Sequence, residues 1–421
     1  MLIRNATLAD TRVRDVLVEE ETIAAVGEDL ESGGEEILDV DEKLLLPGMI
    51  DVHVHFREPG ASHKETWGTG SRSAAAGGVT TVVDQPNTDP PTTDRFGFEM
   101  KERFANSSSV DFGINGGVTG DWDPDSLFEK PLFALGEVFL ADSTGEMGID
   151  TALFETALEY ARKKSVPVTV HAEDETLFDE SVTDRTDADA WSDYRTAVAE
   201  YEAIERACRV AHEMDTRIHI AHTSTPEGVD VATDRGMTCE ATPHHLFLSR
   251  EDLESLGTYG RMNPPLRSET RRRRLFDRLV DGTIDIVATD HAPHTREEKE
   301  ASIWDAPSGV PGVETALPLL LEAAQSGPLD YERIREVTST NPAEIFDLPA
   351  KGKIEPGRDA DLVLFDTENT TTIRGENLHS KCEWTPFDGR VGIFPEWTML
   401  RGTIVYQHGR FTEGTGRNVR T

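Results

Sequence analysis

The amino-acid sequence predicts an α/β protein, in which a (β/α)8 barrel of the TIM-like type is flanked by a small β-sandwich domain. Two observations support this fold. Short apolar segments alternate with helix-like segments through the middle of the chain, whereas both ends contain only short strand-like segments. The length of 421 residues fits about two domains, since a barrel of this type takes about 250 residues.

The two ends of the chain have the same pattern of apolar and polar residues. Apolar and polar residues alternate in MLIRNATL and VRDVLVEEETIAAVGEDL near the start, and in DADLVLFD and WTMLRGTIVYQHGRF near the end. This alternation is typical of half-exposed strands rather than helices. We therefore assign residues 1–46 and 346–421 to one composite β domain built from both termini.

The middle of the chain repeats a strand followed by a helix. The apolar strand-like segments are GVTTVVDQP (78–86), PLFALGEVFLA (131–141), VPVTVHAE (166–173), TRIHIAHTS (216–224), MTCEATPHHL (237–246) and IDIVATDHAP (284–293). Segments between them, such as TALFETALEYARKKS, place apolar residues at helical spacing. Repeated units of this kind imply a parallel sheet, and their number over residues 47–345 favours a closed eight-stranded barrel over an open sheet.

The composition limits the partners and the location. The chain has 79 acidic and 42 basic residues, and its net charge of −37 disfavours nucleic acid and anionic membrane surfaces as partners. We interpret this charge as the acidic surface of a protein from a halophilic cytoplasm, where salt screens self-repulsion.

The start of the chain lacks a signal pattern, no apolar run approaches about 20 residues, and Cys208, Cys239 and Cys382 form no CxxC pair. A cytoplasmic protein with three reduced, buried cysteines is expected.

Histidines and one aspartate stand at the ends of the predicted strands. His53 and His55 end GMIDVHVH, His171 ends VPVTVH, His222 ends IHIAH, and Asp290 ends IDIVATD. In a parallel barrel these ends open on one face, and residues i and i+2 of a strand point to the same side. Four imidazoles and a carboxylate brought together in this way are suitable ligands for zinc.

A single histidine at a strand end is more often a hydrogen-bonded structural residue than a ligand, and HxH alone is a weak signal. The joint pattern is stronger, because several buried imidazoles need partners and a metal ion supplies one. His219 lies three residues before His222 on the same predicted strand, so it faces the other way and is given no ligand role.

These motifs resemble the dihydroorotase family of the amidohydrolase superfamily, class I type. PGMIDVHVHFREPG (47–60) resembles the family's first signature, and HAED (171–174), HIAHTS (219–224), ATPHHL (241–246), RMNPPLRS (261–268) and ATDHAPHT (288–295) follow in the family's order. The likeness covers nearly the whole chain. It implies a metal-bearing barrel with a flanking β domain, and a homo-oligomer of two or four chains.

The resemblance also implies roles for individual residues. The metal-binding positions fall on His53, His55, His171, His222 and Asp290. The positions that contact the substrate fall on Arg57, Asn87, Asn263 and His294, and PSGVPGVETALP (307–318) resembles the loop whose backbone meets the pyrimidine ring. The implied cofactor is zinc, one or two ions in each chain.

One position departs from many relatives, which carry a carboxylated lysine on the fourth strand to bridge two metals. The segment LGEVFLADSTG has no lysine and places Glu137 there. A glutamate also offers two bridging oxygens, and we favour it over Asp142, five residues later. The number of metal ions stays open.

The expected reaction opens or closes a cyclic amide, with carbamoyl aspartate and dihydroorotate as the small-molecule substrates. Zinc would activate water and polarise the carbonyl, and Asp290 would move the proton. A planar guanidinium at Arg57 suits the carboxylate of dihydroorotate, which allantoin and simple hydantoins lack. The alternative for Arg57 is a structural ion pair with an acid such as Glu58.

Two other functions compete with this one. An allantoinase or hydantoinase would use the same scaffold, and Arg57 is the feature that argues against it. An inactive dihydroorotase-like scaffold protein would belong to another class, and the complete set of metal-binding residues argues against that. Association with an aspartate transcarbamoylase is a further expectation from the resemblance.

Overall fold

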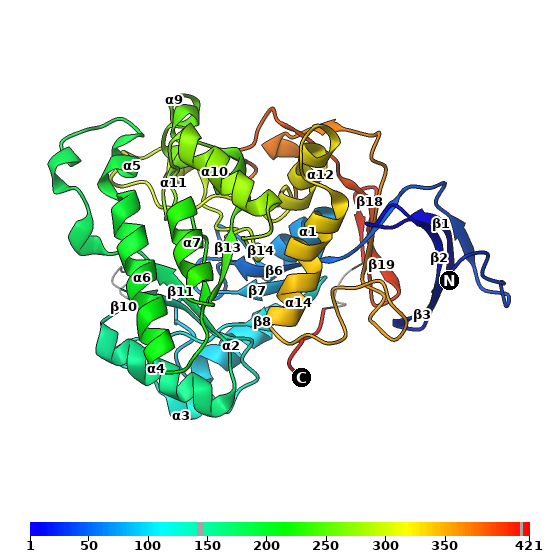
Figure 1. Cartoon of the computed structure of the whole chain (residues 1–421), viewed down its shortest axis with the longest axis horizontal. Coiled ribbons are helices and arrows are strands. Elements are labelled where there is room, and N and C mark those ends of the chain that lie inside the picture. The colour runs from blue at the N-terminus through cyan, green and yellow to red at the C-terminus, as the bar shows by residue number, and fades with distance from the viewer. Residues whose placement is uncertain (141–146, 413–415) are drawn as a thin grey trace.

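Strands from the two ends of the chain lie side by side in one sheet, blue and orange-red in Figure 1. The computed structural model describes residues 1–140, 147–412 and 416–421. The sheet has nine strands in the order β20-β19-β18-β15-β5-β1-β2-β3, with β4 paired to β1. Its strands are β1 (Leu2–Thr7), β2 (Val13–Glu19), β3 (Thr22–Gly27), β4 (Ile37–Asp39), β5 (Leu44–Pro47), β15 (Leu362–Phe365), β18 (Pro395–Leu400), β19 (Thr403–Gln407) and β20 (Arg410–Phe411).

The middle of the chain forms parallel strands, so the predicted α/β class with parallel sheets is confirmed. One sheet contains β6 (Met49–Val54), β7 (Val79–Asp84) and β8 (Asp111–Ile114). A second sheet has the order β10-β9-β11-β12-β13-β14, with β9 (Leu135–Leu140), β10 (Gly148–Ile149), β11 (Val168–Ala172), β12 (His219–Ile220), β13 (Thr238–Ala241) and β14 (Ile286–Val287). A short antiparallel pair, β16 (Thr371–Thr372) and β17 (Val391–Gly392), lies apart from them.

Two isolated bridges link the parallel sheets to each other at both edges. Gly116, which follows β8, pairs in parallel with Leu135 of β9. Val54 of β6 pairs in parallel with His291, which follows β14. The carboxyl ends of β6 and β14 are thereby held next to each other.

Helices follow the parallel strands and surround them (Figure 1). The longer ones are α1 (Trp67–Ala76), α2 (Arg95–Ala105), α4 (Thr151–Lys164), α6 (Ala197–Glu213), α7 (Pro226–Asp234), α10 (Glu269–Val280) and α12 (Ala316–Ser326). The shorter ones are α3 (Pro124–Leu127), α5 (Ala190–Tyr194), α8 (Pro243–Phe247), α9 (Leu253–Leu256), α11 (Arg296–Lys299), α13 (Tyr331–Arg335) and α14 (Asn341–Ile345).

Helix starts follow from local sequence. A threonine or aspartate precedes each of α1, α2, α4, α6 and α7, and its side chain accepts a hydrogen bond from a backbone N–H of the first turn. These caps satisfy donors that a helix cannot pair internally. No helix of the described residues is long and apolar enough to cross a membrane.

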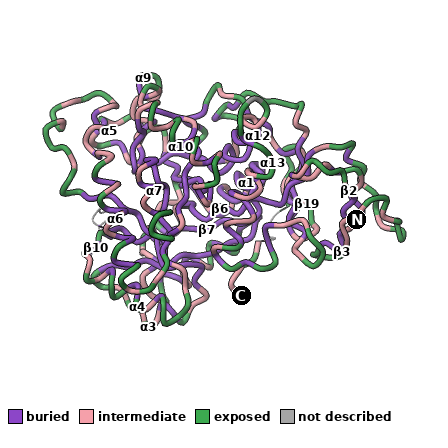
Figure 2. The backbone as a smooth tube through the Cα atoms, viewed as in Figure 1, coloured by how far each residue is buried: buried purple, intermediate pink, exposed green. Residues whose placement is uncertain are grey.

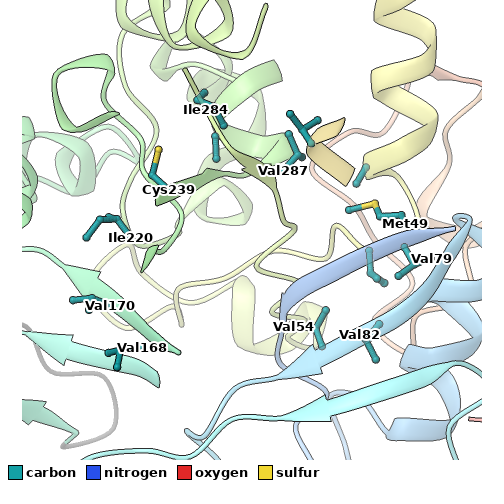
Figure 3. Close-up of a cluster of buried hydrophobic side chains, with 14 of the residues drawn as sticks. Met49, Val54, Val79, Val82, Val168, Val170, Ile220, Cys239, Ile284 and Val287 are labelled. Atoms are coloured by element: carbon teal, nitrogen blue, oxygen red, sulfur yellow. The ribbon is translucent and has the colours of Figure 1, made fainter. Parts of the chain in front are cut away.

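The main hydrophobic core lies between the parallel strands and their helices. Figure 3 shows side chains from this layer, including Val82 of β7, Val170 of β11 and Cys239 of β13. The same cluster contains Ala74 of α1 and Leu158 of α4. Buried residues run through the centre of the molecule, and exposed residues lie mainly at its periphery (Figure 2). All three cysteines are free and buried, as predicted.

One buried lysine ties the nine-stranded sheet to the parallel strands. Lys351 donates from Nζ to Oδ2 of Asp111 in β8 at 2.8 Å, and to Oδ2 of Asp361, next to β15, at 2.6 Å. Asp359 is a third acceptor at 3.1 Å. Burial opposes the charge of Lys351, but the aspartates outweigh it and raise the pKa of the amine. The ion cluster therefore fixes the two parts of the chain against each other.

Lys351→Met is expected to lower the free energy of unfolding by about 3 to 5 kcal/mol, because it leaves buried carboxylates without their cation. Denaturant unfolding followed by circular dichroism measures the change. The control Lys353→Met removes a half-exposed ion pair with Glu344 and should change stability by about 0 to 1 kcal/mol. Equal effects of the two substitutions would contradict the role given to Lys351.

Candidate active site

The six predicted metal-facing residues meet at the carboxyl ends of the parallel strands. His53 lies in β6 and His55 directly follows it, Glu137 lies in β9, His171 lies in β11, His222 follows β12, and Asp290 follows β14. Each is at most 7% exposed. The convergence expected from strand order is therefore present among the described residues.

Glu137 lies between two pairs of histidines. Its Oε1 is 3.1 Å from Nδ1 of His171 and 2.5 Å from Nε2 of His222, while its Oε2 is 3.4 Å from Nε2 of His53. Two groups of ligand atoms share this carboxylate: His53, His55 and Glu137 form one, and Glu137, His171 and His222 form the other. Asp142, the rival bridging residue, lies outside the described residues.

Asp290 faces the first pair of histidines. Its Oδ1 lies 2.9 Å from Nε2 of His55 and 3.6 Å from Nε2 of His53. The backbone of Asp290 has φ 46°, and Arg57 and His222 also have positive φ, at 64° and 33°. Such conformations cost about 1 to 3 kcal/mol each and persist where the surrounding structure imposes them.

The electrostatics of the cluster keep the carboxylate of Glu137 ionised. Burial alone would raise the pKa of Glu137, but His222 and His53 outweigh burial and hold it well below the usual value. Burial likewise disfavours the charged form of His53, but Glu240 and Glu137 raise its pKa. The cluster therefore presents anionic oxygens together with imidazole nitrogens, the donor set that zinc takes.

The surroundings of one buried imidazole nitrogen, Nε2 of His53, indicate whether a metal ion fits this cluster. Nε2 of His53 makes no hydrogen bond among the described residues, although it lies between Glu137 and Asp290. A buried imidazole nitrogen without a partner is costly, and a metal ion at this point would satisfy it. The residues present therefore fit a metal ion.

Buried glutamates contact two of the metal-facing histidines, His53 and His171, and also contact His219. Glu240 in β13 accepts from Nδ1 of His53 at 2.6 Å, and it also contacts Nε2 of His219 at 3.1 Å. Glu173 lies 3.3 Å from Nε2 of His171. Such partners fix the tautomer and orientation of a metal-binding imidazole.

Sequence reasoning missed Glu240 and Glu173, although each is an acid in an apolar strand-like segment and such an acid needs a buried partner. His219 belongs to neither group of ligand atoms, and its ring nitrogens contact Glu240 at 3.1 Å and Oγ1 of Thr238 at 2.9 Å. Asn87 accepts from Nδ1 of His55 at 2.8 Å, so it also stands behind a histidine.

A pocket opens beside the metal-facing residues. Arg57, Asn87 and Asn263, three of the four predicted substrate contacts, line it. The other lining residues are His55, Glu137, Phe139, His171, His222, Asp290, Ala292, Ser308 and Gly309. Arg57 forms no ion pair among the described residues, and Glu58 instead accepts from the backbone N–H of Trp67.

His294, the fourth predicted contact, lies behind Arg57. Nε2 of His294 is 3.1 Å from the Arg57 guanidinium and 2.9 Å from the carbonyl oxygen of Ser308. Lys64 lies 3.1 Å from Nδ1 and can only donate, so Nδ1 accepts and Nε2 carries the proton. Burial, and then the charges of Arg57 and Lys64, lower the pKa of His294 well below its ordinary value. His294 is therefore a neutral donor beside the guanidinium.

Asn263 is held by its amide oxygen. Oδ1 accepts from Nε1 of Trp191 at 3.1 Å and from Oγ of Ser308 at 3.0 Å. The NH2 group of Asn263 is therefore what this residue offers to a molecule in the pocket.

The chain is similar to proteins of one family along nearly its whole length. Residues 44–391 match the Amidohydrolase family. A protein named dihydroorotase from Halobacterium salinarum is 63% identical over 421 residues, which cover 100% of this chain and 99% of that protein. A dihydroorotase from Methanosarcina acetivorans is 44% identical, covering 96% of this chain and 93% of that protein.

Solved structures of related enzymes have the same fold. L-hydantoinase (dihydropyrimidinase) from Arthrobacter aurescens has a TM-score of 0.94 at 29% identity and covers 99% of this chain and 98% of its own. Dihydropyrimidinase from Brevibacillus agri has a TM-score of 0.92 at 27% identity and covers 100% of this chain and 98% of its own.

Glu240→Gln is expected to weaken the affinity for added zinc about 10- to 100-fold, because an amide cannot accept from His53 and His219 together. Competition with a chelator of known affinity measures this. The matched control is Glu314→Gln, another buried glutamate that pairs with a histidine, His379, outside the pocket. Unchanged zinc affinity in Glu240→Gln, or an equal loss in the control, would contradict the role of Glu240.

Proposed function

The chain belongs to the amidohydrolase family, and we propose that it is a zinc-dependent dihydroorotase of de novo pyrimidine (UMP) biosynthesis. It interconverts N-carbamoyl-L-aspartate and (S)-dihydroorotate. The observation that carries the substrate assignment is Arg57, a guanidinium without an acidic partner among the described residues, in the same pocket as Asp290. The relatives named dihydroorotase support the same activity.

The metal ligands of the proposal are His53, His55, Glu137, His171, His222 and Asp290. The position of Glu137 between the two histidine pairs supports a bridging role and two zinc ions rather than one. Zinc, when bound, supplies Lewis acidity toward the amide carbonyl and lowers the pKa of water toward about 7. Glu240, Glu173 and Asn87 hold the imidazoles in the orientation that this requires.

Arg57 binds the carboxylate that dihydroorotate carries on its ring. A guanidinium can donate two parallel hydrogen bonds to a carboxylate, and Nε of Arg57 is already oriented by the carbonyl oxygen of Pro293 at 3.2 Å. The NH2 group of Asn87 is a further donor near this position, whereas the Nε2–H of His294 already donates to the carbonyl oxygen of Ser308. Asn263 then contacts the other side of the substrate ring.

Asp290 moves the proton. In hydrolysis a water oxygen attacks the ring carbonyl carbon, the ring amide C–N bond breaks, and a carboxylate forms with release of one proton of the water to the solvent. Asp290 takes a proton from the attacking water and gives it to the ring nitrogen, which leaves as part of the carbamoyl group. Ring closure reverses these steps.

We infer that β6, β7, β8, β9, β11, β12, β13 and β14 close into a (β/α)8 barrel, which the bridges Gly116–Leu135 and Val54–His291 support. The barrel spans residues 47–345, and residues 1–46 and 346–421 form the composite β-sandwich domain. Resemblance to dihydroorotases supports a cytoplasmic homo-oligomer of two or four chains and association with an aspartate transcarbamoylase. The acidic composition supports the absence of nucleic-acid and membrane partners.

A hydantoinase is the second candidate, because solved structures with that name superpose on nearly the whole chain. Purified, zinc-loaded protein offered dihydroorotate, allantoin and hydantoin is expected to open dihydroorotate at least about 100-fold more efficiently, a discrimination of about 2.8 kcal/mol from the carboxylate contacts. Ring opening is followed by ultraviolet absorbance, and bound zinc by elemental analysis. Preference for hydantoin or allantoin would replace the substrate assignment, and zinc-loaded protein without any activity would favour a scaffold.

Arg57→Ala is expected to raise KM for dihydroorotate about 10- to 100-fold with unchanged zinc content, because a charge-assisted hydrogen bond contributes about 1.5 to 3 kcal/mol. Steady-state kinetics and elemental analysis measure the two quantities. Arg57→Lys keeps the charge but not the paired donors, so it should restore only part of the loss. Loss of zinc in Arg57→Ala would show that the residue supports the metal ligands instead.

A further inference from the structure

Lys299, the last residue of α11, is fully buried. Lysine is seldom buried without a carboxylate partner. Two other buried lysines have one, since Lys101 pairs with Asp84 at 2.5 Å and Lys351 pairs with its aspartate cluster. Lys299 forms no ion pair with any carboxylate of the described residues. The partners of its ammonium group are backbone carbonyl groups instead.

All three donors of the Lys299 ammonium are used by backbone carbonyl groups. Nζ donates to the carbonyl oxygens of Arg261 and Pro307, both at 3.0 Å, and of Gly309 at 3.2 Å. An ammonium has three N–H donors, so each carbonyl takes one. Burial, followed by the charges of Arg261 and Arg57, lowers the pKa of Lys299. The three carbonyl dipoles stabilise its charge, together with the ring of Trp384, whose centroid lies 5.7 Å from Nζ.

The three carbonyls belong to two loops that form one wall of the pocket. The first loop carries Asn263, two residues after Arg261, and the second carries Ser308 and Gly309. The loops also contact each other, since the N–H of Gly309 donates to the Arg261 carbonyl at 3.0 Å. Lys299, which does not itself line the pocket, therefore connects both loops.

The second loop has little room to shift. A Cβ atom at Gly309 would lie 2.7 Å from the carbonyl oxygen and from Cβ of Ala292, which follows Asp290 by two residues. The N–H of Ala292 donates to the carbonyl of Val310 at 2.9 Å. Displacement of this loop would change the distance between the pocket wall and the metal-facing residues.

We propose that Lys299 is a positioning residue, which fixes the two loops so that Asn263, Ser308 and Gly309 hold the substrate ring opposite Asp290. The identity of that substrate rests on the proposed function. Lys299 lies on the same short segment as Asp290 and His294. Residues 290–299 therefore position both Asp290, which moves the proton, and the pocket wall that lies opposite it. Loss of the three hydrogen bonds leaves the metal ligands in place and loosens only the wall.

The kinetic test compares Lys299→Met, which keeps the length and loses every donor, with Lys299→Gln, which keeps two. Lys299→Met is expected to raise KM for dihydroorotate at least about 10-fold, with an intermediate value for Lys299→Gln and unchanged zinc content in both. The matched control Lys351→Met removes a buried lysine outside the pocket, so it should lower stability without changing KM. A KM within about twofold of the wild type in Lys299→Met, or an equal rise in the control, would overturn the proposal.

Hydrogen–deuterium exchange tests the same role without a substrate. Peptides that cover residues 261–263 and 307–312 should exchange at least about tenfold faster in Lys299→Gln than in the wild type, while peptides of α6 should not change. This result keeps its meaning if Lys299→Met fails to fold or if dihydroorotate is not the substrate. Unchanged exchange in both loops would overturn the proposal, whereas failure of the wild type to open dihydroorotate would overturn only the proposed function.

Discussion

The carboxylate of Glu137 is buried among four imidazoles, and most of the site can be understood from what this burial requires. Its exposed fraction is 2%, and an ion so far from water needs opposite charge and hydrogen-bond donors close by. Histidines in or directly after β6, β11 and β12 provide donors, and Glu240 and Glu173 face the outer sides of two of these rings. The charge of Glu137 and the orientation of the surrounding imidazole rings are therefore fixed by the same set of contacts.

The two sides of the pocket are built differently. The metal-facing side consists of residues in or next to hydrogen-bonded parallel strands, where backbone pairing limits movement. The opposite side consists of loops, and loops keep one shape only where side chains bind their backbone groups. Lys299 and His294 bind such carbonyl groups here, so buried side chains replace the missing strand pairing.

The acidic surface and the buried lysines reflect one compositional pattern. Only 10 of the 42 basic residues are lysine, and the acidic residues number 79. Many arginines pair with acids at the surface, as Arg250 does with Asp189 and Asp193. Three of the ten lysines, Lys101, Lys299 and Lys351, are buried, where a small ammonium group fits several acceptors and a planar guanidinium does not.

The sequence by itself determined the α/β class, the parallel strands and the histidines and aspartate that meet at the strand ends. These follow from local patterns, since strand alternation and strand ends can be recognised in one segment at a time. Lys64 and Lys299 could not be recognised in this way, because each acts through a partner on another segment and nothing in its own neighbourhood marks it. Glu240 and Glu173 stand out locally as acids in apolar segments, but their partners lie on other segments and could not be recognised. The tertiary structure also decided that His294 lies behind Arg57 and that Asn87 supports His55. Side-chain roles of this kind depend on distances between segments far apart in the chain, and only folding sets those distances.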